Sequence, residues 1–284
     1  MQGPRRSVQL VTVALALMLA LAATFGLGQP MPVQAQENAV TLEWWGWSHF
    51  RLTSPNGKVI LLNPFITGNP DAAVSLDDIM HADLILAADG HRDEVGDTAE
   101  IAQRTGAMVF AAGGGVNGWL IEQGVPQAQI PQRFAQPGNV LRLDGITVRM
   151  LNSIHGSELP QPTMANPYGG IAGSYMITFE NGYTIYFQGS SAATVDMALW
   201  AEMYKPDLMI FHMGGQHDPL DVAMSIRLMT TNNPNLRNLV PHHHRAQVPA
   251  GQTSIADVEQ AMGQLGVSIP ITDVVRSQVY NLTK

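Results

Sequence analysis

The sequence contains no cysteine, and this absence limits both its covalent chemistry and its metal chemistry. Without thiols the chain forms no disulfides even in an oxidising compartment, and every thiolate metal site is excluded. Any metal must therefore be bound by histidine, aspartate, glutamate or water. The chain has 9 histidines and 23 acidic residues to draw on.

Basic residues are also few. The 15 Lys and Arg stand against 23 Asp and Glu, which gives a formal net charge of −8 at pH 7. Because an acidic surface repels polyanions, the composition argues against nucleic acid and anionic membranes as partners. We expect a small-molecule substrate, and the sequence leaves the oligomeric state open, a homo-oligomer included.

The first 35 residues have the composition of an export signal. The basic pair Arg5-Arg6 precedes an apolar run over residues 8–27, and Val33-Gln34-Ala35 places small side chains where a signal peptidase reads them. We therefore predict a signal peptide over residues 1–35 and a periplasmic or secreted product free of the membrane. The alternative is an uncleaved membrane anchor, since the apolar run is nearly long enough to span a bilayer. The arginine pair also points toward twin-arginine export.

The remainder, residues 36–284, is about 250 residues long, which suits one domain with a substantial core. Early β-rich runs pair across a turn signal at Pro55-Asn56-Gly57, and a later hairpin is predicted across Asn181-Gly182. We expect strands over residues 41–45, 50–54, 59–63, 82–88, 108–111, 146–151, 173–179, 183–188, 208–211, 238–240 and 275–282, and helices over 98–105, 116–123, 218–229 and 254–265. This order predicts two sheets with helices outside them.

Histidines and acids gather where the apolar runs end. They are Asp89, His91, Asp93 and Glu94 after 82–88, His155 after 146–151, His212 and His217 after 208–211, and His242, His243 and His244 after 238–240, with Ser190 after 183–188. Binding groups accumulate in loops at strand ends. Any one of these histidines alone is more often a solvated loop residue. The Asp-x-His-x-Asp-Glu spacing is what favours a shared metal site, because alternate loop residues can turn toward one ion.

Further landmarks carry a family resemblance. They are Trp45-Gly46-Trp47-Ser48-His49-Phe50, Asn63-Pro64-Phe65, Gly96-Asp97-Thr98, Gly189-Ser190-Ser191, Met213-Gly214-Gly215 and Pro241 to His244. From about Thr41 to the last strand, the chain resembles the metallo-β-lactamase superfamily, in the branch of predicted metal-dependent hydrolases similar to L-ascorbate-6-phosphate lactonases. That resemblance implies an α/β fold, the four-layer αββα sandwich.

The resemblance also implies a set of metal ligands: Asp89, His91, Asp93, Glu94, His155, Ser190 and His243. The family motif His-x-His-x-Asp-His falls on residues 89–94, so acids replace its first and last histidines. Ser190 stands where the family has an aspartate that bridges two metals. Trp47 stands where the family usually has histidine, and Asn63 where it has aspartate.

A protein of this family is expected to hydrolyse a small ester, lactone or phosphoester with a metal-activated water, and Asp93 would bind metal or take the proton. Exchanging imidazoles for carboxylates shifts the metal preference from zinc toward manganese, iron or magnesium. We therefore expect one or two ions of manganese, iron or zinc, the second weakened by the neutral Ser190 hydroxyl. Two alternatives stay open: a binding protein without metal, in which Arg92 pairs with the acids, and a metal-binding protein without turnover.

Overall fold

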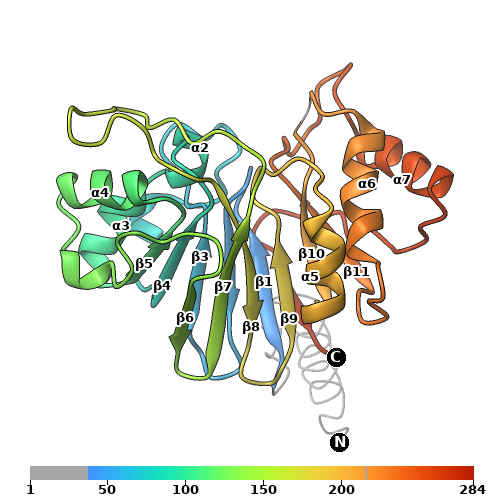
Figure 1. Ribbon diagram of the computed structural model, residues 1–284, viewed down its shortest axis with the longest axis horizontal. Coiled ribbons are helices and arrows are strands. Elements are labelled where there is room, and N and C mark those ends of the chain that lie inside the picture. The colour runs from blue at the N-terminus through green and yellow to red at the C-terminus, as the bar shows by residue number, and fades with distance from the viewer. Residues whose placement is uncertain (1–37, 215) are drawn as a thin grey trace, which may run out of the picture. The chain divides into compact units, whose positions relative to one another are not determined.

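A computed structural model describes residues 38–214 and 216–284 of the chain (Figure 1). Two six-stranded sheets face each other, and helices cover their outer faces. The signal peptide predicted over residues 1–35 lies outside the described residues. Within the described ranges, no helix has both the length and the apolar character needed to cross a membrane.

The first sheet has the strand order β12-β1-β2-β3-β4-β5. Its strands are β1 (Val40–Trp44), β2 (Phe50–Thr53), β3 (Val59–Leu62), β4 (Leu84–Ala87), β5 (Met108–Ala111) and β12 (Val279–Leu282). β3, β4 and β5 are parallel, and parallel neighbours require crossover connections. The crossovers contain the 3₁₀ turn η1 (Leu76–Asp78) before β4 and the helices α2 (Arg92–Val95) and α3 (Thr98–Thr105) after it.

The second sheet has the order β11-β10-β9-β8-β7-β6. Its strands are β6 (Val140–Leu143), β7 (Ile146–Asn152), β8 (Gly173–Thr178), β9 (Thr184–Phe187), β10 (Leu208–His212) and β11 (Asn238–His242). β9, β10 and β11 are parallel, and α5 (Asp196–Tyr204) and α6 (Pro219–Met229) lie in their crossovers. Helix α4 (Gly114–Glu122) and the turn η2 (Gln127–Gln129) precede β6, and α7 (Ile255–Gln264) follows β11.

Alternate residues of the central strands face different apolar layers. On β4, Leu84 and Leu86 pack between the two sheets, whereas Ile85 and Ala87 pack toward α3 and α4. β10 shows the same alternation, with its outer face packed against α5, α6 and α7. Because side chains alternate along a strand, a sheet apolar on both faces can be covered on both. The result is the αββα sandwich, which confirms the predicted fold.

Some elements differ from the sequence-based expectation. Residues 92–95 form α2 where a loop was expected, with Asp93 and Glu94 in its first turn, where acids suit the helix dipole. α5 was not predicted because its apolar residues form no clear stripe along one face. β6 is a short edge strand whose Arg142 is exposed, so its pattern is weak. Both predicted hairpin turns are confirmed, and each has its glycine at positive φ.

The ligand-type residues meet at one edge of the sandwich. They follow the carboxyl ends of β4, β7, β9, β10 and β11. β7 points the same way as β9 because both are antiparallel to β8. Loops at the carboxyl ends of parallel strands share one edge of a sheet, which is where α/β proteins bind ligands.

Candidate metal centre

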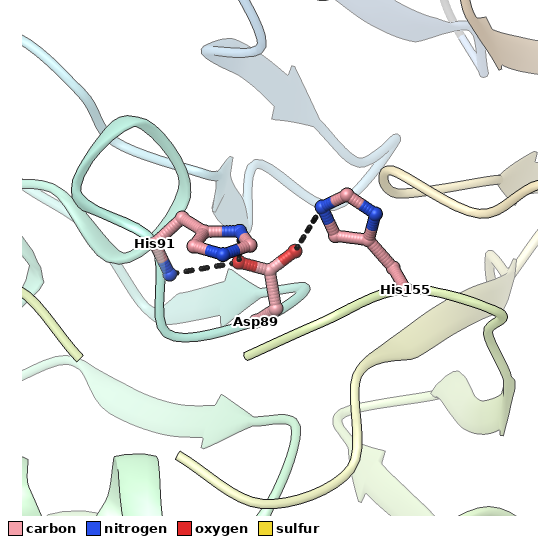
Figure 2. Close-up of side chains that lie close together, drawn as sticks. All are labelled: Asp89, His91 and His155. Atoms are coloured by element: carbon pink, nitrogen blue, oxygen red, sulfur yellow. Dashed lines mark hydrogen bonds and ion pairs between the residues drawn. The ribbon is translucent and has the colours of Figure 1, made fainter. Parts of the chain in front are cut away.

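Asp89, His91 and His155 form a compact set of metal-ligand side chains, which we call the cation group (Figure 2). One ligand atom from each lies within 4.8 Å of the other two. Asp89 is fully buried directly after β4, and its Oδ2 has no hydrogen-bond partner, although His155 Nε2 is 3.9 Å away. A buried carboxylate oxygen without a partner is costly. The donor set and this unpartnered oxygen both fit a cation held between Asp89 and the two imidazoles.

His91 lies between two carboxylates. His91 Nδ1 lies 3.1 Å from Asp89 Oδ1, and Nε2 lies 2.5 Å from Glu158 Oε2. The hydrogen bond to Asp89 is the main cause that raises the pKa of His91 to about 9, with a further contribution from Glu158 and an opposing one from burial. Burial is the main cause that lowers the pKa of His155. A metal binds neutral imidazole, so a cation at this position would replace the proton of His91.

Glu94 lies next to the cation group but has quite different partners. It is fully buried, its Oε1 accepts a hydrogen bond of 2.8 Å from the Ser190 hydroxyl, and its Oε2 accepts one from the Asn63 amide. The Asn63 carbonyl in turn accepts the Ala88 backbone N–H at 2.9 Å. Burial, and then the charges of Asp89 and Asp93, raise the pKa of Glu94 well above its usual range. Both carboxyl oxygens of Glu94 are therefore already hydrogen-bonded within the protein.

Asp93 is similarly occupied. Its Oδ2 accepts a hydrogen bond of 2.9 Å from the Trp47 indole and lies 3.2 Å from His243 Nε2. Burial alone would raise the pKa of Asp93, but the hydrogen bonds and charge of His243, together with Trp47, outweigh it and lower the pKa to about 2. Asp93 is thus an ionised carboxylate at neutral pH. We call Asn63, Glu94, Ser190, Asp93, Trp47 and His243 the hydrogen-bonded group.

Three residues of the hydrogen-bonded group have left-handed backbone conformations. φ is +58° at Trp47, +43° at Asn63 and +62° at His243. Asparagine tolerates this region, but bulky side chains there cost on the order of 1–3 kcal/mol. The Trp47 carbonyl accepts the His243 backbone N–H at 3.1 Å, and the two rings lie 4.7 Å apart. Loops from the two sheets are therefore joined at this point in strained conformations, a feature that gathers at functional sites.

A pocket of 460 Å³ opens above both groups. Its described lining residues are Trp47, His91, Asp93, His155, His212, Gly214, Gln216, His217, His243 and Gln252. Asp89, Glu94 and Ser190 are buried and do not appear in that lining. The edge of the sandwich thus brings all seven predicted ligand residues together, four at the pocket surface and three beneath it.

The pocket wall also contains two histidines that were not assigned to the site from the sequence. The rings of His212 and His217 lie 4.5 Å apart, and His212 is 4.7 Å from the His243 ring. His212 is buried, and neither of its ring nitrogens has a hydrogen-bond partner. Both residues also line an adjoining pocket of 320 Å³. Their place at the end of β10 and in the loop after it was the available signal, since the other site residues also lie at strand ends.

The Arg92 side chain contacts a backbone carbonyl and not the acids of the site. The expectation that it pairs with Asp89 or Glu94 is wrong: its guanidinium donates to the Thr67 carbonyl at 2.8 Å. Glu158, which contacts His91, was not expected from the sequence. It belongs to the irregular stretch after β7, where no periodic pattern marks a contact 67 residues away.

Comparisons with known proteins identify the family that this chain resembles. Residues 58–249 match the family described as the Beta-lactamase superfamily domain. The chain is 32% identical over 262 residues to a UPF0173 metal-dependent hydrolase of Cupriavidus taiwanensis, with 86% of each chain covered. It is 31% identical to one of Polynucleobacter asymbioticus, with 91% of this chain and 92% of the relative covered.

Solved structures show the same fold. Igni18, a metallo hydrolase from Ignicoccus hospitalis, superposes with a TM-score of 0.68 at 22% identity, covering 87% of this chain and 99% of that one. A possible metal-dependent hydrolase from Veillonella parvula superposes with a TM-score of 0.63 at 19% identity, covering 87% of this chain and all of that one.

Proposed function

Because this chain belongs to the metal-dependent hydrolase branch of the beta-lactamase superfamily, we propose that it hydrolyses a small uncharged ester or lactone. The observation that carries this proposal is the buried, unpartnered Oδ2 of Asp89 beside His91 and His155. One carboxylate and two imidazoles suit a divalent ion of manganese, iron or zinc. When bound, such an ion supplies a water whose pKa is lowered toward neutrality.

Asp93 is the residue proposed to orient the attacking water. It lines the pocket together with His91 and His155, and Trp47 and His243 hold its carboxylate in place. A group with a pKa of about 2 is a weak base at neutral pH. Asp93 would therefore accept a hydrogen bond from the water and fix its direction, and it is too weak a base to remove the proton.

The charge of the pocket supports an uncharged substrate. Among the described residues that line the 460 Å³ pocket and its neighbour, none is lysine or arginine. A phosphoester would bring negative charge into a pocket that already contains Asp93, without a fixed cation from the protein to receive it. Burial lowers the pKa of His212 well below its usual range, so this lining residue brings no positive charge to the pocket either.

The test is turnover by metal-loaded protein on matched panels of esters, lactones and phosphoesters. We expect turnover of uncharged esters or lactones, and loss of both metal and turnover in Asp89→Asn. The control is Asp77→Asn, which makes the same chemical change at a fully exposed side chain. Stoichiometric metal without turnover on any panel would favour a metal-binding protein without catalysis. Absence of metal after loading would favour a metal-free binding protein, and turnover confined to phosphoesters would overturn the substrate class.

We also propose that the protein is exported to the periplasm or beyond the cell. The proposal is supported by the Arg5-Arg6 pair, the apolar run over residues 8–27 and the small residues at Val33-Gln34-Ala35. Cell fractionation followed by N-terminal sequencing tests it. A periplasmic or secreted product that begins at Gln36 is the expected result. An intact chain in the membrane fraction would favour the anchor instead.

A further inference from the structure

We propose that this chain binds one cation, and that hydrogen bonds among Asn63, Glu94 and Ser190 take the place of a second. The inference rests on the proposed function only in placing the one cation at Asp89, His91 and His155. It extends that function by separating the predicted ligand residues into those that hold metal and those that hold one another.

Each oxygen of the Glu94 carboxyl group already accepts a hydrogen bond within the protein. Ser190 donates to Oε1 at 2.8 Å, and Asn63 donates to Oε2. Glu94 is fully buried, so a cation at either oxygen would compete with a hydrogen bond in a place where water does not replace it. Asp89 presents the opposite case, because its buried Oδ2 has no donor at all.

The orientation of Asn63 makes its bond to Glu94 obligatory. The Asn63 carbonyl accepts the Ala88 backbone N–H at 2.9 Å, so the amide NH₂ must face Glu94. Aspartate at this position would present an acceptor oxygen to a second carboxylate. Asn63 and Glu94 are therefore a matched donor and acceptor. An aspartate at position 63 would not donate to Glu94, so the asparagine and the buried glutamate fit each other.

The remaining side chains of this region complete the arrangement. Ser190 brings no charge and donates its hydroxyl proton to Glu94. Asp93 Oδ2 receives the Trp47 indole N–H and faces His243 Nε2, so this nitrogen of His243 is directed at a carboxylate. Among the described residues, the cation group is the only set of three or more histidine or acidic side chains whose ligand atoms all lie within 4.8 Å of one another. Both oxygens of Glu94 and Oδ2 of Asp93 thus have partners inside the hydrogen-bonded group, whereas His243 Nδ1 is buried without one.

Metal stoichiometry tests this inference directly. Protein stripped with a chelator and reloaded with Mn(II), Co(II) or Zn(II) should bind one equivalent, measured by elemental analysis and by the Co(II) absorption spectrum. Asp89→Asn should lose that equivalent. Glu94→Gln should keep it, because a glutamine carbonyl can accept from Asn63 while its amide donates to the Ser190 oxygen.

A gain of binding provides the complementary test. The triple variant Asn63→Asp, Glu94→His, Ser190→Asp removes the three hydrogen-bonding partners and adds an imidazole and two carboxylates. It should bind a second equivalent, with circular dichroism and thermal melting to show that it is folded. A folded triple variant that stays at one equivalent would contradict the claim that these hydrogen bonds exclude the second cation.

The outcomes separate the inference from the proposed function. Two equivalents in the unmodified protein, or loss of metal in a folded Glu94→Gln variant, overturn the single-cation inference and leave metal-dependent hydrolysis intact. No metal in the unmodified protein overturns both.

Discussion

The cation group and the hydrogen-bonded group each take two side chains from residues 89–94, yet they differ in how their carboxylates are hydrogen-bonded. Asp89 and Glu94 are both fully buried. Glu94 meets two donors, Asn63 and Ser190, whereas Asp89 Oδ2 meets none. The presence of a carboxylate in the motif is therefore not enough to place a cation. What matters is whether other parts of the chain already donate hydrogen bonds to that carboxylate.

The largest effect is expected from replacing the unpartnered Oδ2 of Asp89. In Asp89→Asn the site loses its buried negative charge, and we expect metal affinity to fall by more than the roughly 10- to 100-fold that loss of an outer-sphere partner costs. Calorimetric titration with Mn(II) or Zn(II) measures this. Glu158→Gln is the control, since it changes an exposed partner of His91 and should have the smaller effect. Equal affinities for the two variants would place the cation elsewhere.

Glu94→Ala disrupts the hydrogen-bonded group. It leaves buried donors from Asn63 and Ser190 without acceptors and creates a cavity, and we expect a loss of about 2–4 kcal/mol in the free energy of unfolding. Glu94→Gln, which keeps the volume, should cost under about 1.5 kcal/mol. Urea denaturation of metal-free protein measures both. If the alanine variant is as stable as the glutamine variant, the hydrogen bonds to Glu94 contribute little.

Histidines outside both groups give a pH test that involves no metal. Burial lowers the pKa of His49 to about 3 and is the main cause that lowers the pKa of His244 to about 4. Unfolding raises these values toward 6.5, so the unfolded chain takes up protons that the folded chain refuses. The contribution of these two histidines to stability is therefore full above pH 6.5 and falls as the pH drops toward 4, by up to about 1.4 kcal/mol per pH unit for each histidine.

His49→Phe should remove one proton from that slope, because phenylalanine does not titrate. Denaturation in the presence of a chelator at pH 7, 6, 5 and 4 measures it. His81→Asn serves as the matched control, since the His81 side chain is 61% exposed. A slope that His49→Phe leaves unchanged would mean that His49 is protonated in the folded protein.

Trp47→Phe should have the smallest effect, and it tests whether Asp93 belongs to the hydrogen-bonded group or binds the cation. It keeps a ring beside His243 but removes the indole N–H that Asp93 accepts. One such hydrogen bond is worth about 0.5–1.5 kcal/mol, so we expect a roughly 2- to 13-fold fall in kcat with unchanged metal content. Loss of metal in this variant would show that Asp93 is a ligand after all.

Much of the fold could be predicted because the core strands are buried on both faces. Such strands appear as continuous apolar runs, as at residues 82–88, and burial dominates their energetics. The helix α2 could not be predicted in this way, since its four residues are too short to show a periodic pattern. Residues 92–95 were therefore expected in a loop with the other ligands, but they form a helical turn that begins after His91.

The position of the site could be predicted from the sequence, but its separation into the cation group and the hydrogen-bonded group could not. Strand ends indicated that Asp89, His91 and His155 would converge. The bonds that set Glu94 and Asp93 apart span 31 residues to Asn63, 96 to Ser190 and 46 to Trp47. Hydrogen-bond direction depends on side-chain orientation across those distances, and no local pattern in the sequence records it.

The left-handed backbone at Trp47 and His243 has a consequence for attempts to improve this protein. Glycine or asparagine would occupy φ of +62° more easily than histidine does. Selection for heat resistance alone should therefore favour such replacements at position 243, and each would remove the ring that faces Asp93. This corner of the molecule is where a stability–activity trade-off would first appear, so a thermostability screen should carry a parallel assay for function.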